Sequence, residues 1–585
     1  MAARAARPGV LALAVLVAVA TAVTAAASRP APETSRPDAV EAPPALAYPV
    51  PAGAVFVAEG GDDAAAGTEA APLGSLAAAV RRVPAGGTIV VRGGTYRQTV
   101  GDVTKRITVQ PYPGERVWFK GSVVVDRWAR DGRVWRHAGW TVRLCHTCFV
   151  PAIIDPAHPW AGLPDMVFVD DRPLRQVGTA EAVGAGAFFV DRERQELVIG
   201  DDPDGAVVEA AALDRLLQFD GGAGGSVVRG IGVAHYATNQ NYGKRGAMIV
   251  VNAPDVTVEN VTFAWSASSG LGVFQPGARV RGSVFRNNGL VGMVANRADD
   301  LRVTGSSFTG NNQERFALTG EAIGAAGAKV TRTKRPHFAG NTFADNIGTG
   351  WWCDLGCTDA VVVRNVAARN AGNGLYYEVS ARALIASNVL AGNARGVKVS
   401  SSDHVRLHHN TFAGNRLSLG LYNDPRAPEF DAYAVERGLS WHTMDTALVN
   451  NFFAQEDADT PVIESADHKA APRPEPFVAV ADGNAYLRPS GPAPLVVWAH
   501  GGGRTAAYPT LAALTAATGA DRHGLEAVPT GSPFTDPAGA SGDRYGSYAL
   551  RPDAPGFRAG RPLPAEVAAA LGVPADPHPS IGILP

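Results

Sequence analysis

The chain has 585 residues, with 53 basic and 55 acidic side chains and a formal net charge of −2. This balance gives no electrostatic attraction to nucleic acid or to an anionic membrane surface, and we expect neither as a partner. The chain contains 66 Gly and 42 Pro, and only 18% of its residues are charged, which favours many tight turns over long amphipathic helices.

The N-terminal segment, residues 1–27, has the features of a secretory signal peptide. Arg4 and Arg7 precede a long apolar run that ends in three alanines from Ala25, a suitable cleavage site. We therefore expect a secreted, extracellular protein with no membrane span in the mature chain. A retained N-terminal membrane anchor is the alternative, because the run is nearly long enough to cross a bilayer. Residues 28–51 are Pro-rich and are expected to form a linker.

The next two segments are predicted to be a cap and an insertion. Residues 52–114 contain a short helical pattern at residues 75–82, followed by the first strands of the fold. Such a helix would cover the open end of a stack of strands and protect its edge. Residues 115–215 show alternating strand patterns that do not fit the repeat described next, and they are expected to form a β-rich insertion.

The four cysteines fall into two local pairs. Cys145 and Cys148 lie in "CHTC", and Cys353 and Cys357 lie in "CDLGC". Either pair could form a disulfide in a secreted chain. A zinc site at "CHTC" would need a second pair of Cys or His ligands at suitable spacing, and none is evident, so no metal is expected.

A short sequence motif repeats through the middle of the chain. It places an apolar residue ahead of Asn and Gly in "ENVTFAW", "GSVFRNN", "GSSFTGNN", "GNTFADN", "RNVAARN", "SNVLAGN" and "HNTFAGN". The apolar positions are Phe263, Phe285, Phe308, Phe343, Ala367, Leu390 and Phe412, with spacings of 22, 23, 35, 24, 23 and 22 residues. Only the coil that holds residues 309–342 therefore carries an insertion.

Three short Val-rich strands and three turns in each repeat predict an all-β solenoid, a parallel β-helix, over residues 216–460. Matching asparagines would form side-chain ladders, and matching phenylalanines would stack inside. A leucine-rich horseshoe is the other solenoid considered, but its Leu pattern is absent. The repeat fades after Tyr422, and residues 461–585 are expected to be a C-terminal extension that packs on the solenoid and contains two helical patterns, "YPTLAALTAATG" and "LPAEVAAALG".

Two carboxylates recur one coil apart, in "GWWCDLG" and "GLYYEVS". Aligned on their glycines, these segments superpose Trp352 on Tyr376 and Asp354 on Glu378. Neighbouring strands lie about 4.8 Å apart. Because strand side chains alternate, the four residues share one face, and we expect that face to point to solvent.

Extending this register adds a residue from the coil on either side. Lys329 and Lys398 join the aromatic column, and the neighbouring column contains Thr331, Asp354, Glu378 and Ser400. Aromatic faces suit sugar rings, and two carboxyl groups about 5 to 5.5 Å apart suit a retaining glycosidase. Two acids so close repel each other when both are charged, so one is expected to stay protonated and to act as the proton donor.

A structural interpretation of these residues remains open. The acids and lysines could form a surface ion network of little energetic value, although like charges side by side are unfavourable in a sheet. His404, His408 and His409 are expected to be structural or surface residues. Glu321 and Asp424 are loop residues that could reach over the same groove.

The segment "VFVAEGGDDAAAGTEAAPLGSLAAAVRRVPAGGTIVVRGGTYR", followed by coils of the "GNTFADN" type, resembles the secreted right-handed parallel β-helix proteins of the pectin-lyase-like superfamily over most of residues 52–455. The resemblance implies a right-handed solenoid and a role on polysaccharides or oligosaccharides. The acid pair is similar to that of the β-helix retaining β-xylosidases of glycoside hydrolase family 120. That similarity implies Asp354 as nucleophile and Glu378 as acid/base, but it does not extend to xylose specificity. From their residue types and register, Trp352, Tyr376, Lys329 and Lys398 are expected to bind substrate.

Two other functions remain open. A polysaccharide lyase would use Lys398 or Lys329 as the base and Ca²⁺ to neutralise a uronate carboxylate. The sequence lacks an evident cluster of outward acids for calcium, so no cofactor is expected outside that alternative. A non-catalytic glycan-binding or cell-envelope protein would use the aromatic column only for docking. The sequence gives no indication of an oligomer.

Overall fold

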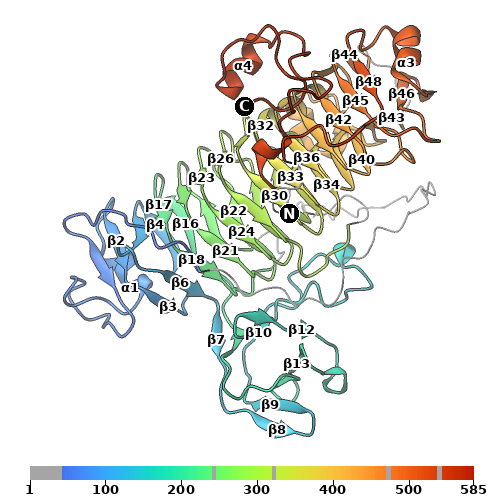
Figure 1. Ribbon diagram of the computed structural model, residues 1–585. Coiled ribbons are helices and arrows are strands. Elements are labelled where there is room, and N and C mark those ends of the chain that lie inside the picture. The colour runs from blue at the N-terminus through green and yellow to red at the C-terminus, as the bar shows by residue number, and fades with distance from the viewer. Residues whose placement is uncertain (1–41, 240–245, 319–323, 470–475, 537–542) are drawn as a thin grey trace, which may run out of the picture. The chain divides into compact units, whose positions relative to one another are not determined.

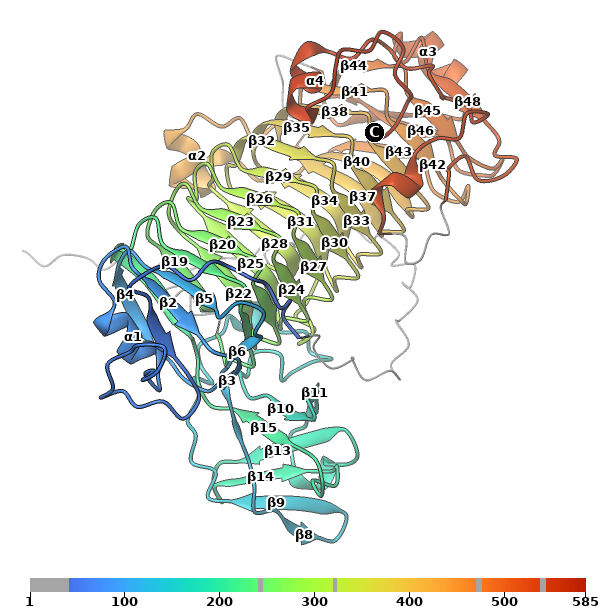
Figure 2. The same ribbon diagram turned by 60° about the vertical axis from the view of Figure 1, so that its left-hand side comes forward.

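The computed structural model describes residues 42–239, 246–318, 324–469, 476–536 and 543–585. These residues form three long sheets of 13 strands each, and successive coils contribute one strand to each sheet (Figures 1 and 2). The predicted parallel β-helix is therefore confirmed. The expected signal peptide and the first part of the Pro-rich linker lie outside the described residues. None of the helices in the described ranges is long and apolar enough to cross a membrane.

Sheet 1 is parallel throughout. Its strands are β1 (Val55–Val57), β2 (Thr88–Val91), β5 (Thr108–Pro111), β17 (Val227–Arg229), β20 (Thr257–Glu259), β23 (Arg279–Arg281), β26 (Arg302–Thr304), β29 (His337–Ala339), β32 (Thr358–Val363), β35 (Ala381–Ala386), β38 (Asp403–His408), β41 (Thr446–Val449) and β44 (Val478–Asp482).

Sheet 2 is parallel except for its last strand, which pairs antiparallel with its neighbour. Its strands are β4 (Gly101–Lys105), β16 (Leu217–Gly222), β19 (Ala247–Asn252), β22 (Ser269–Val273), β25 (Val291–Asn296), β28 (Ala326–Thr331), β31 (Thr349–Asp354), β34 (Asn373–Glu378), β37 (Arg395–Ser400), β40 (Leu417–Asn423), β43 (Ile463–Asp467), β46 (Val496–Gly501) and β47 (Arg504–Tyr508).

Sheet 3 contains the short strands that carry the repeated aromatic residues. Its strands are β3 (Gly94–Tyr96), β6 (Val117–Lys120), β18 (Gly232–Ala234), β21 (Thr262–Ala264), β24 (Val284–Arg286), β27 (Ser307–Thr309), β30 (Thr342–Ala344), β33 (Val366–Ala368), β36 (Val389–Ala391), β39 (Thr411–Ala413), β42 (Phe452–Ala454), β45 (Ala485–Leu487) and β48 (Leu525–Ala527).

Aromatic rings stack along the interior of the solenoid, as the repeat predicts. Phe263 lies 4.9 Å from Phe285, which lies 4.5 Å from Phe308, which in turn lies 4.9 Å from Phe343, measured between ring centroids. All four side chains are fully buried. Because no coil can bury its own apolar face, these contacts between neighbouring coils form the core.

Asparagine ladders fix the turns between the sheets, also as predicted. In one ladder each amide nitrogen donates to the side-chain oxygen of the next asparagine at 2.8 to 2.9 Å. Its members are Asn288, Asn311, Asn346, Asn370, Asn393 and Asn415. The same amides also donate to backbone carbonyls, such as Asn370 to Phe343 at 2.9 Å. A second ladder runs from Asn341 to Asn484.

The N-terminal end of the solenoid is covered by α1 (Leu76–Arg82). Ser75 begins the helix, and its hydroxyl accepts a hydrogen bond from the backbone nitrogen of Ala78 at 3.1 Å. Leu76 and Ala79 are buried in the main core. The predicted capping helix is therefore present, and it protects the apolar end of the first coils.

Two small sheets form the insertion, between β7 (Ser122–Val124) and β15 (Val208–Ala211). A buried ion cluster ties its base to the solenoid. The Lys120 ammonium lies 2.9 Å from the Glu209 carboxylate and also contacts Asp171. The ring of His235 stacks on Phe168 with 3.7 Å between centroids. Further along, Ile153 packs with Leu290, Phe316 and Ala325 of the solenoid.

The repeat continues further than the sequence indicated. Strands β41 to β48 add coils after Tyr422, in register with the earlier ones. Long connections between these strands hide the period in the sequence. The two C-terminal helical patterns form α3 (Leu511–Thr518) and α4 (Ala565–Leu571), and Val567 and Leu571 of α4 pack on Val363 and Ala386 of sheet 1.

His409 joins the C-terminal segment to the solenoid. Its Nδ1 donates to the carbonyl of Ser580 at 3.1 Å, and its Nε2 accepts from the Asn450 side chain at 3.0 Å. Burial lowers the pKa of His409 to about 4, and the hydrogen bonds to backbone carbonyls offset only part of this effect. The ring is therefore neutral in the folded protein, which agrees with the structural role expected for it.

We expect replacement of Asn370 by Ala to destabilise the fold by about 2 to 4 kcal/mol. The change leaves buried partners on two neighbouring coils unsatisfied, and each such group costs about 1 to 3 kcal/mol. Chemical denaturation followed by tryptophan fluorescence would measure this. As a control, Asn296→Ala removes one hydrogen bond to Thr331 (3.1 Å) at a half-buried site and should cost about 1 kcal/mol. Equal losses in the two variants would contradict the ladder's role.

Stability should fall as the pH is lowered from about 7 to about 4.5. The unfolded chain protonates His409 near its ordinary pKa of about 6.5, whereas the folded chain does so only near pH 4. This contribution is therefore fully present above pH 6.5 and is lost as the pH falls through the folded pKa. Thermal unfolding should show a weaker pH dependence for His409→Gln.

Candidate functional site

The strand register places the predicted aromatic column on four consecutive coils of sheet 2. Lys329 of β28 pairs with Trp352 of β31, which pairs with Tyr376 of β34, which pairs with Lys398 of β37. The rings of Trp352 and Tyr376 stack with 5.1 Å between centroids. The Lys329 ammonium lies 3.4 Å from the centre of the Trp352 ring, and that of Lys398 lies 4.5 Å from the Tyr376 ring. Each ring of the aromatic pair therefore has a cation–π contact with a lysine from the adjacent outer coil.

The column points away from the core but is not exposed to solvent. Trp351 and Cys353 belong to the main core, and Trp352 and Asp354, on the opposite face of the strand, do not. The exposed fractions are 4% for Trp352, 1% for Tyr376, 5% for Asp354 and 0% for Glu378. Lys329 and Lys398 are also buried. The prediction that this face is open to solvent is therefore wrong.

The connection between β40 and β41, residues 424–445, packs over the strand ends that carry the two acids. Its residues Ala434, Leu439 and Trp441 pack against Val379, which directly follows Glu378. The helix α2 (Ala432–Glu436) lies in this connection. Its N-terminal Asp431 pairs with Arg332 at 3.0 Å. The connection has no repeat of its own, so its packing over the ends of these strands cannot be predicted from the period.

The four strands of the column end at the same corner. Each is followed by a residue with positive φ: Arg332 at 48°, Leu355 at 53°, Val379 at 37° and Ser401 at 47°. A β-branched residue such as Val379 rarely adopts this conformation, which marks the corner after Glu378 as strained. Asp354 and Glu378 are thus the last residues of β31 and β34, held at a sharp change of chain direction.

At this corner the ladder between β31 and β34 is replaced by local contacts. The last registered pair is Cys353 with Tyr377, one residue before the two acids. The backbone nitrogen of Leu355 donates to the Asp354 carboxylate at 2.7 Å. On the next coil, the carbonyl of Glu378 accepts from the Ser380 hydroxyl at 2.6 Å. The two acids therefore lie on adjacent coils at the same level, without a regular backbone pairing between them.

Each acid has a cation as its partner. The Lys329 ammonium lies 3.0 Å from the Asp354 carboxylate. Arg426 forms an ion pair with the Glu378 carboxylate, which also accepts a hydrogen bond from the indole nitrogen of Trp352 at 2.8 Å. These two cations offset the repulsion expected between neighbouring carboxylates.

Arg426 is the site residue that the sequence did not reveal. Its guanidinium donates to the Asp424 carboxylate at 2.9 and 3.1 Å, and Asp424 also accepts from the Ser400 hydroxyl at 3.0 Å. Burial alone would lower the pKa of Arg426, but the Asp424 hydrogen bond and the Glu378 charge raise it overall. Asp424, suggested as a loop candidate, therefore reaches Glu378 through Arg426. The only signal in the sequence was the charged "NDPR" directly after a strand.

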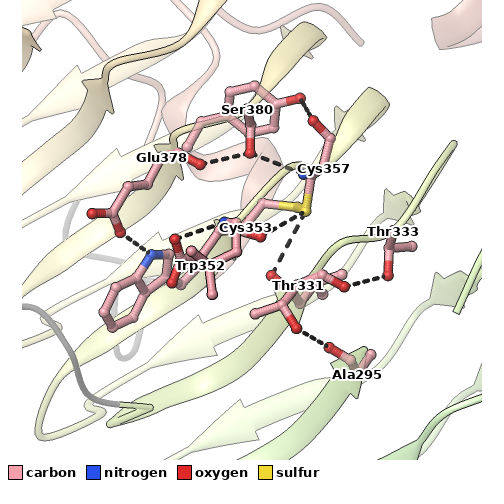
Figure 3. Close-up of a disulfide and its surroundings, with 12 residues drawn as sticks. Ala295, Thr331, Thr333, Trp352, Cys353, Cys357, Glu378 and Ser380 are labelled. Atoms are coloured by element: carbon pink, nitrogen blue, oxygen red, sulfur yellow. Dashed lines mark hydrogen bonds between the residues drawn. A yellow bond between two sulfur atoms is a disulfide. The ribbon is translucent and has the colours of Figure 1, made fainter. Parts of the chain in front are cut away.

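A disulfide between Cys353 and Cys357 closes the corner that holds Asp354 (Figure 3). The backbone nitrogen of Cys357 donates to the hydroxyl of Ser380 at 3.0 Å, and that hydroxyl donates to the carbonyl of Glu378. One side chain thus links the two corners. The second predicted pair, Cys145 and Cys148, is also a disulfide, so these sulfur atoms do not bind zinc.

The remaining candidates have contacts of their own or lie outside the described residues; Thr331 is the strand partner of Asp354 on the preceding coil. Glu321 is among the residues that the structure does not describe. His404 is half exposed beside Asp403, and His408 is buried with its pKa lowered to about 4 by burial. Thr331 donates to the side-chain oxygen of Asn296 at 3.1 Å. None of these contacts indicates a catalytic role.

In the described part of the chain, the residues grouped closely enough to hold a metal ion are Asp171, Glu209 and His235, at the base of the insertion. The Lys120 ammonium already lies among them, 2.9 Å from Glu209. A cation in this position supplies the charge that a metal would bring. These residues therefore form a structural ion cluster, and they are distant in the fold from the strand ends that carry the acids.

Comparison with known proteins supports the fold. Residues 247–416 match the family described as "Right handed beta helix region". No match was found among curated proteins. A solved structure described as "The complex structure of XylC with xylose" is similar, with a TM-score of 0.54 and 16% identity, over 74% of this chain and 83% of that one.

Two further solved structures are similar at lower scores. One, described as "Glycoside hydrolase", has a TM-score of 0.45 and 14% identity, over 62% of this chain and 94% of that one. The GH136 lacto-N-biosidase from Eubacterium ramulus has a TM-score of 0.38 and 11% identity, over 81% of this chain and 67% of that one. At such identities the likeness concerns the fold alone. The three parallel sheets and the match of residues 247–416 to the β-helix family model show that the chain has the fold of a right-handed parallel β-helix.

Proposed function

We propose that the protein is a secreted, carbohydrate-active enzyme, a retaining glycoside hydrolase in which Asp354 and Glu378 carry the chemistry. The observation that supports this is the register of sheet 2. It brings two acids to the ends of neighbouring strands, beside two stacked aromatic rings. Neighbouring strands are about 4.8 Å apart, which suits the separation of about 5 to 5.5 Å between the carboxyl groups of retaining enzymes.

Asp354 is assigned as nucleophile and Glu378 as acid/base, in the order that the resemblance to the β-helix β-xylosidases implies. Asp354 would attack the anomeric carbon to form a glycosyl-enzyme, while Glu378 gives its proton to the leaving oxygen. Glu378 would then take a proton from the water that releases the sugar. Lys329, which contacts Asp354, would fix the orientation of the attacking oxygen.

The pairing of Arg426 with Glu378 belongs to the state without substrate. A guanidinium and an indole nitrogen both donate to the Glu378 carboxylate, and release of the guanidinium would favour a proton on this acid. Arg426 keeps two hydrogen bonds to Asp424 when it leaves Glu378. Entry of a sugar would therefore separate Arg426 from the acid without leaving the guanidinium unpaired.

A role for Lys329 as the base of a lyase fits less well. Its ammonium lies between the Asp354 carboxylate and the Trp352 ring, and accepting a proton from substrate would require the loss of both contacts. Lys398 remains the base to consider for that chemistry. A purely glycan-binding protein would use the same residues without turnover, and the products of a glycan digest separate the three functions.

The acid pair is tested by a screen of plant, algal and bacterial glycans. We expect Asp354→Asn and Glu378→Gln each to lower the rate by about 10² to 10⁴, the usual contribution of such groups. Asp359→Asn, which removes a half-exposed acid paired with Arg382, is the matched control and should retain activity. The wild type should release sugars of unchanged anomeric form. Unsaturated, UV-absorbing products would indicate a lyase, and intact glycans would indicate a binding protein.

Arg426 is proposed as a positioning residue, and a pH profile tests it. Without this cation Glu378 should hold its proton to higher pH, because a neighbouring arginine shifts such a carboxyl by about 1 to 3 pH units. The alkaline limb of kcat/KM should therefore move up by about one unit in Arg426→Gln. Arg437→Gln, on the same connection, should leave the limb in place. An unchanged limb in Arg426→Gln would remove Glu378 as the proton donor.

A further inference from the structure

A pocket with a volume of about 200 Å³ opens on the side of the aromatic pair that is opposite to the acids. Thr349, Asn373 and Arg395 line it as the first residues of β31, β34 and β37, whereas Asp354 and Glu378 are the last residues of β31 and β34. The edges of Trp352 and Tyr376 form the wall between the two regions. The other lining residues are Ala317, Leu318, Ala325, Gly348, Gly372, Ala394 and Arg416.

Positive charge distinguishes this pocket from the neighbouring column. Among the described residues that line it, the charged ones are Arg395 and Arg416. The cations beside the acids are already paired, Lys329 with Asp354 and Arg426 with Asp424 and Glu378. In the described part of the chain no carboxylate is recorded in an ion pair with either pocket arginine.

Arg395 is only partly satisfied. One of its terminal nitrogens donates to the side-chain oxygen of Asn373 at 3.0 Å, and its guanidinium lies 5.1 Å from the centre of the Tyr422 ring. Its Nε atom is buried and has no hydrogen-bond partner among the described residues. Buried polar groups are normally paired, and an unpaired donor of a charged group is costly.

The fold makes room for this guanidinium. Gly420, on the next coil of sheet 2, lies directly against the Arg395 side chain. A Cβ atom at position 420 would lie 2.4 Å from Cε2 of the Tyr422 ring and 3.0 Å from both Cδ and Nε of Arg395. The absence of a side chain there leaves space for both the Tyr422 ring and the Arg395 side chain against this strand.

We propose that this pocket binds a sugar unit with an anionic substituent, a carboxylate or a sulfate ester, which pairs with Arg395 and Arg416. The inference rests on the proposed carbohydrate role of the column, and it names the substrate class. A planar guanidinium donates two parallel hydrogen bonds to such groups. The pocket is smaller than the roughly 300–1,000 Å³ typical for drug-sized ligands, which suits a single sugar ring.

The pocket and the acid pair share one side chain. The indole of Trp352 lines the pocket, and its nitrogen donates to Glu378 at 2.8 Å. A sugar held by Arg395 would therefore contact the same indole that binds the proposed acid/base, and its charged substituent would be directed at the arginine, away from the acids. This arrangement separates the negative charge of the substrate from the two carboxylates.

The insertion supports the outer wall of the pocket. The backbone nitrogen of Ala317 donates to the carbonyl of Ile153 at 3.0 Å, and Ile153 packs with Ala325 and Phe316. Ala317 and Ala325 both line the pocket. The insertion thus contributes to the selection of the sugar without a residue of its own in the chemistry.

Calorimetric titration of the whole chain, in the wild type and in Asp354→Asn, tests the proposal. The probes are methyl β-glucuronide, methyl β-galacturonide, methyl β-glucoside 6-sulfate and the neutral methyl β-glucoside. We expect at least one anionic probe to bind about tenfold or more tightly than the neutral one, which corresponds to about 1.4 kcal/mol. The comparison of uronide with sulfate identifies which anion is preferred.

Variants test which residues cause the preference for the anionic probe. Arg395→Gln should abolish the preference for the charged probe, Arg416→Gln should reduce it, and Arg395→Lys should retain part of it. Gly420→Ala should weaken binding by displacing Arg395 while all charges remain. Arg504→Gln, an exposed arginine of β47, is the control and should bind as the wild type does. The thermal midpoint of each variant shows whether it is folded.

Two outcomes would overturn the inference: equal or absent binding of charged and neutral probes by the wild type, or a preference that survives in the Arg395→Gln/Arg416→Gln double variant. Failure of the proposed hydrolase is a separate result. An arginine-dependent preference for anionic sugars in a protein that cleaves no glycan would keep the pocket and reject the hydrolase. Cleavage of neutral glycans that depends on Asp354 but not on the arginines would support the hydrolase and reject the anionic-sugar pocket.

Discussion

The return of every coil to the same register is the constraint on which the rest of the structure depends. A strand in this solenoid has no partner within its own coil, so its backbone groups and its apolar side chain are satisfied only by the coils before and after it. The asparagine ladders enforce this register, because each amide bonds both the next asparagine and a backbone carbonyl. A coil of different length can be added only where it bulges out between two ladder positions.

The candidate site follows from that register. Four strands that start at the same level place lysine, tryptophan, tyrosine and lysine in a line. The same strands end at one corner, and this corner presents Asp354 and Glu378. Chemistry at the ends of the strands and selection at their beginnings would then lie on opposite sides of the Trp352 and Tyr376 side chains. The irregular connections between coils add residues that a regular coil does not contain. One connection supplies Arg426, which pairs with Glu378, and another supplies part of the pocket lining.

The sequence predicts the features that recur in every coil, but few features of the irregular connections between coils. The spacing from Phe263 to Phe412 is sufficient for the solenoid, the ladders and the shared face of Asp354 and Glu378. Burial of that face could not be predicted, because Leu439 and Trp441 lie in a connection without periodicity. Arg426 was missed for the same reason. Arg395 is the first residue of β37, directly after a turn, where an arginine is usually solvated, and only the folded arrangement shows that it lines a pocket.

The bond between Cys353 and Cys357 makes the corner at Asp354 depend on the redox state of its surroundings. Disulfides persist in oxidising compartments and are reduced in a typical cytosol. A chain produced inside cells with a reducing interior would carry two thiols here, and the turn after Asp354 would then be held only by its hydrogen bonds. Preparations from reducing and oxidising expression hosts would therefore differ at this corner, even though the asparagine ladders hold the same solenoid in both.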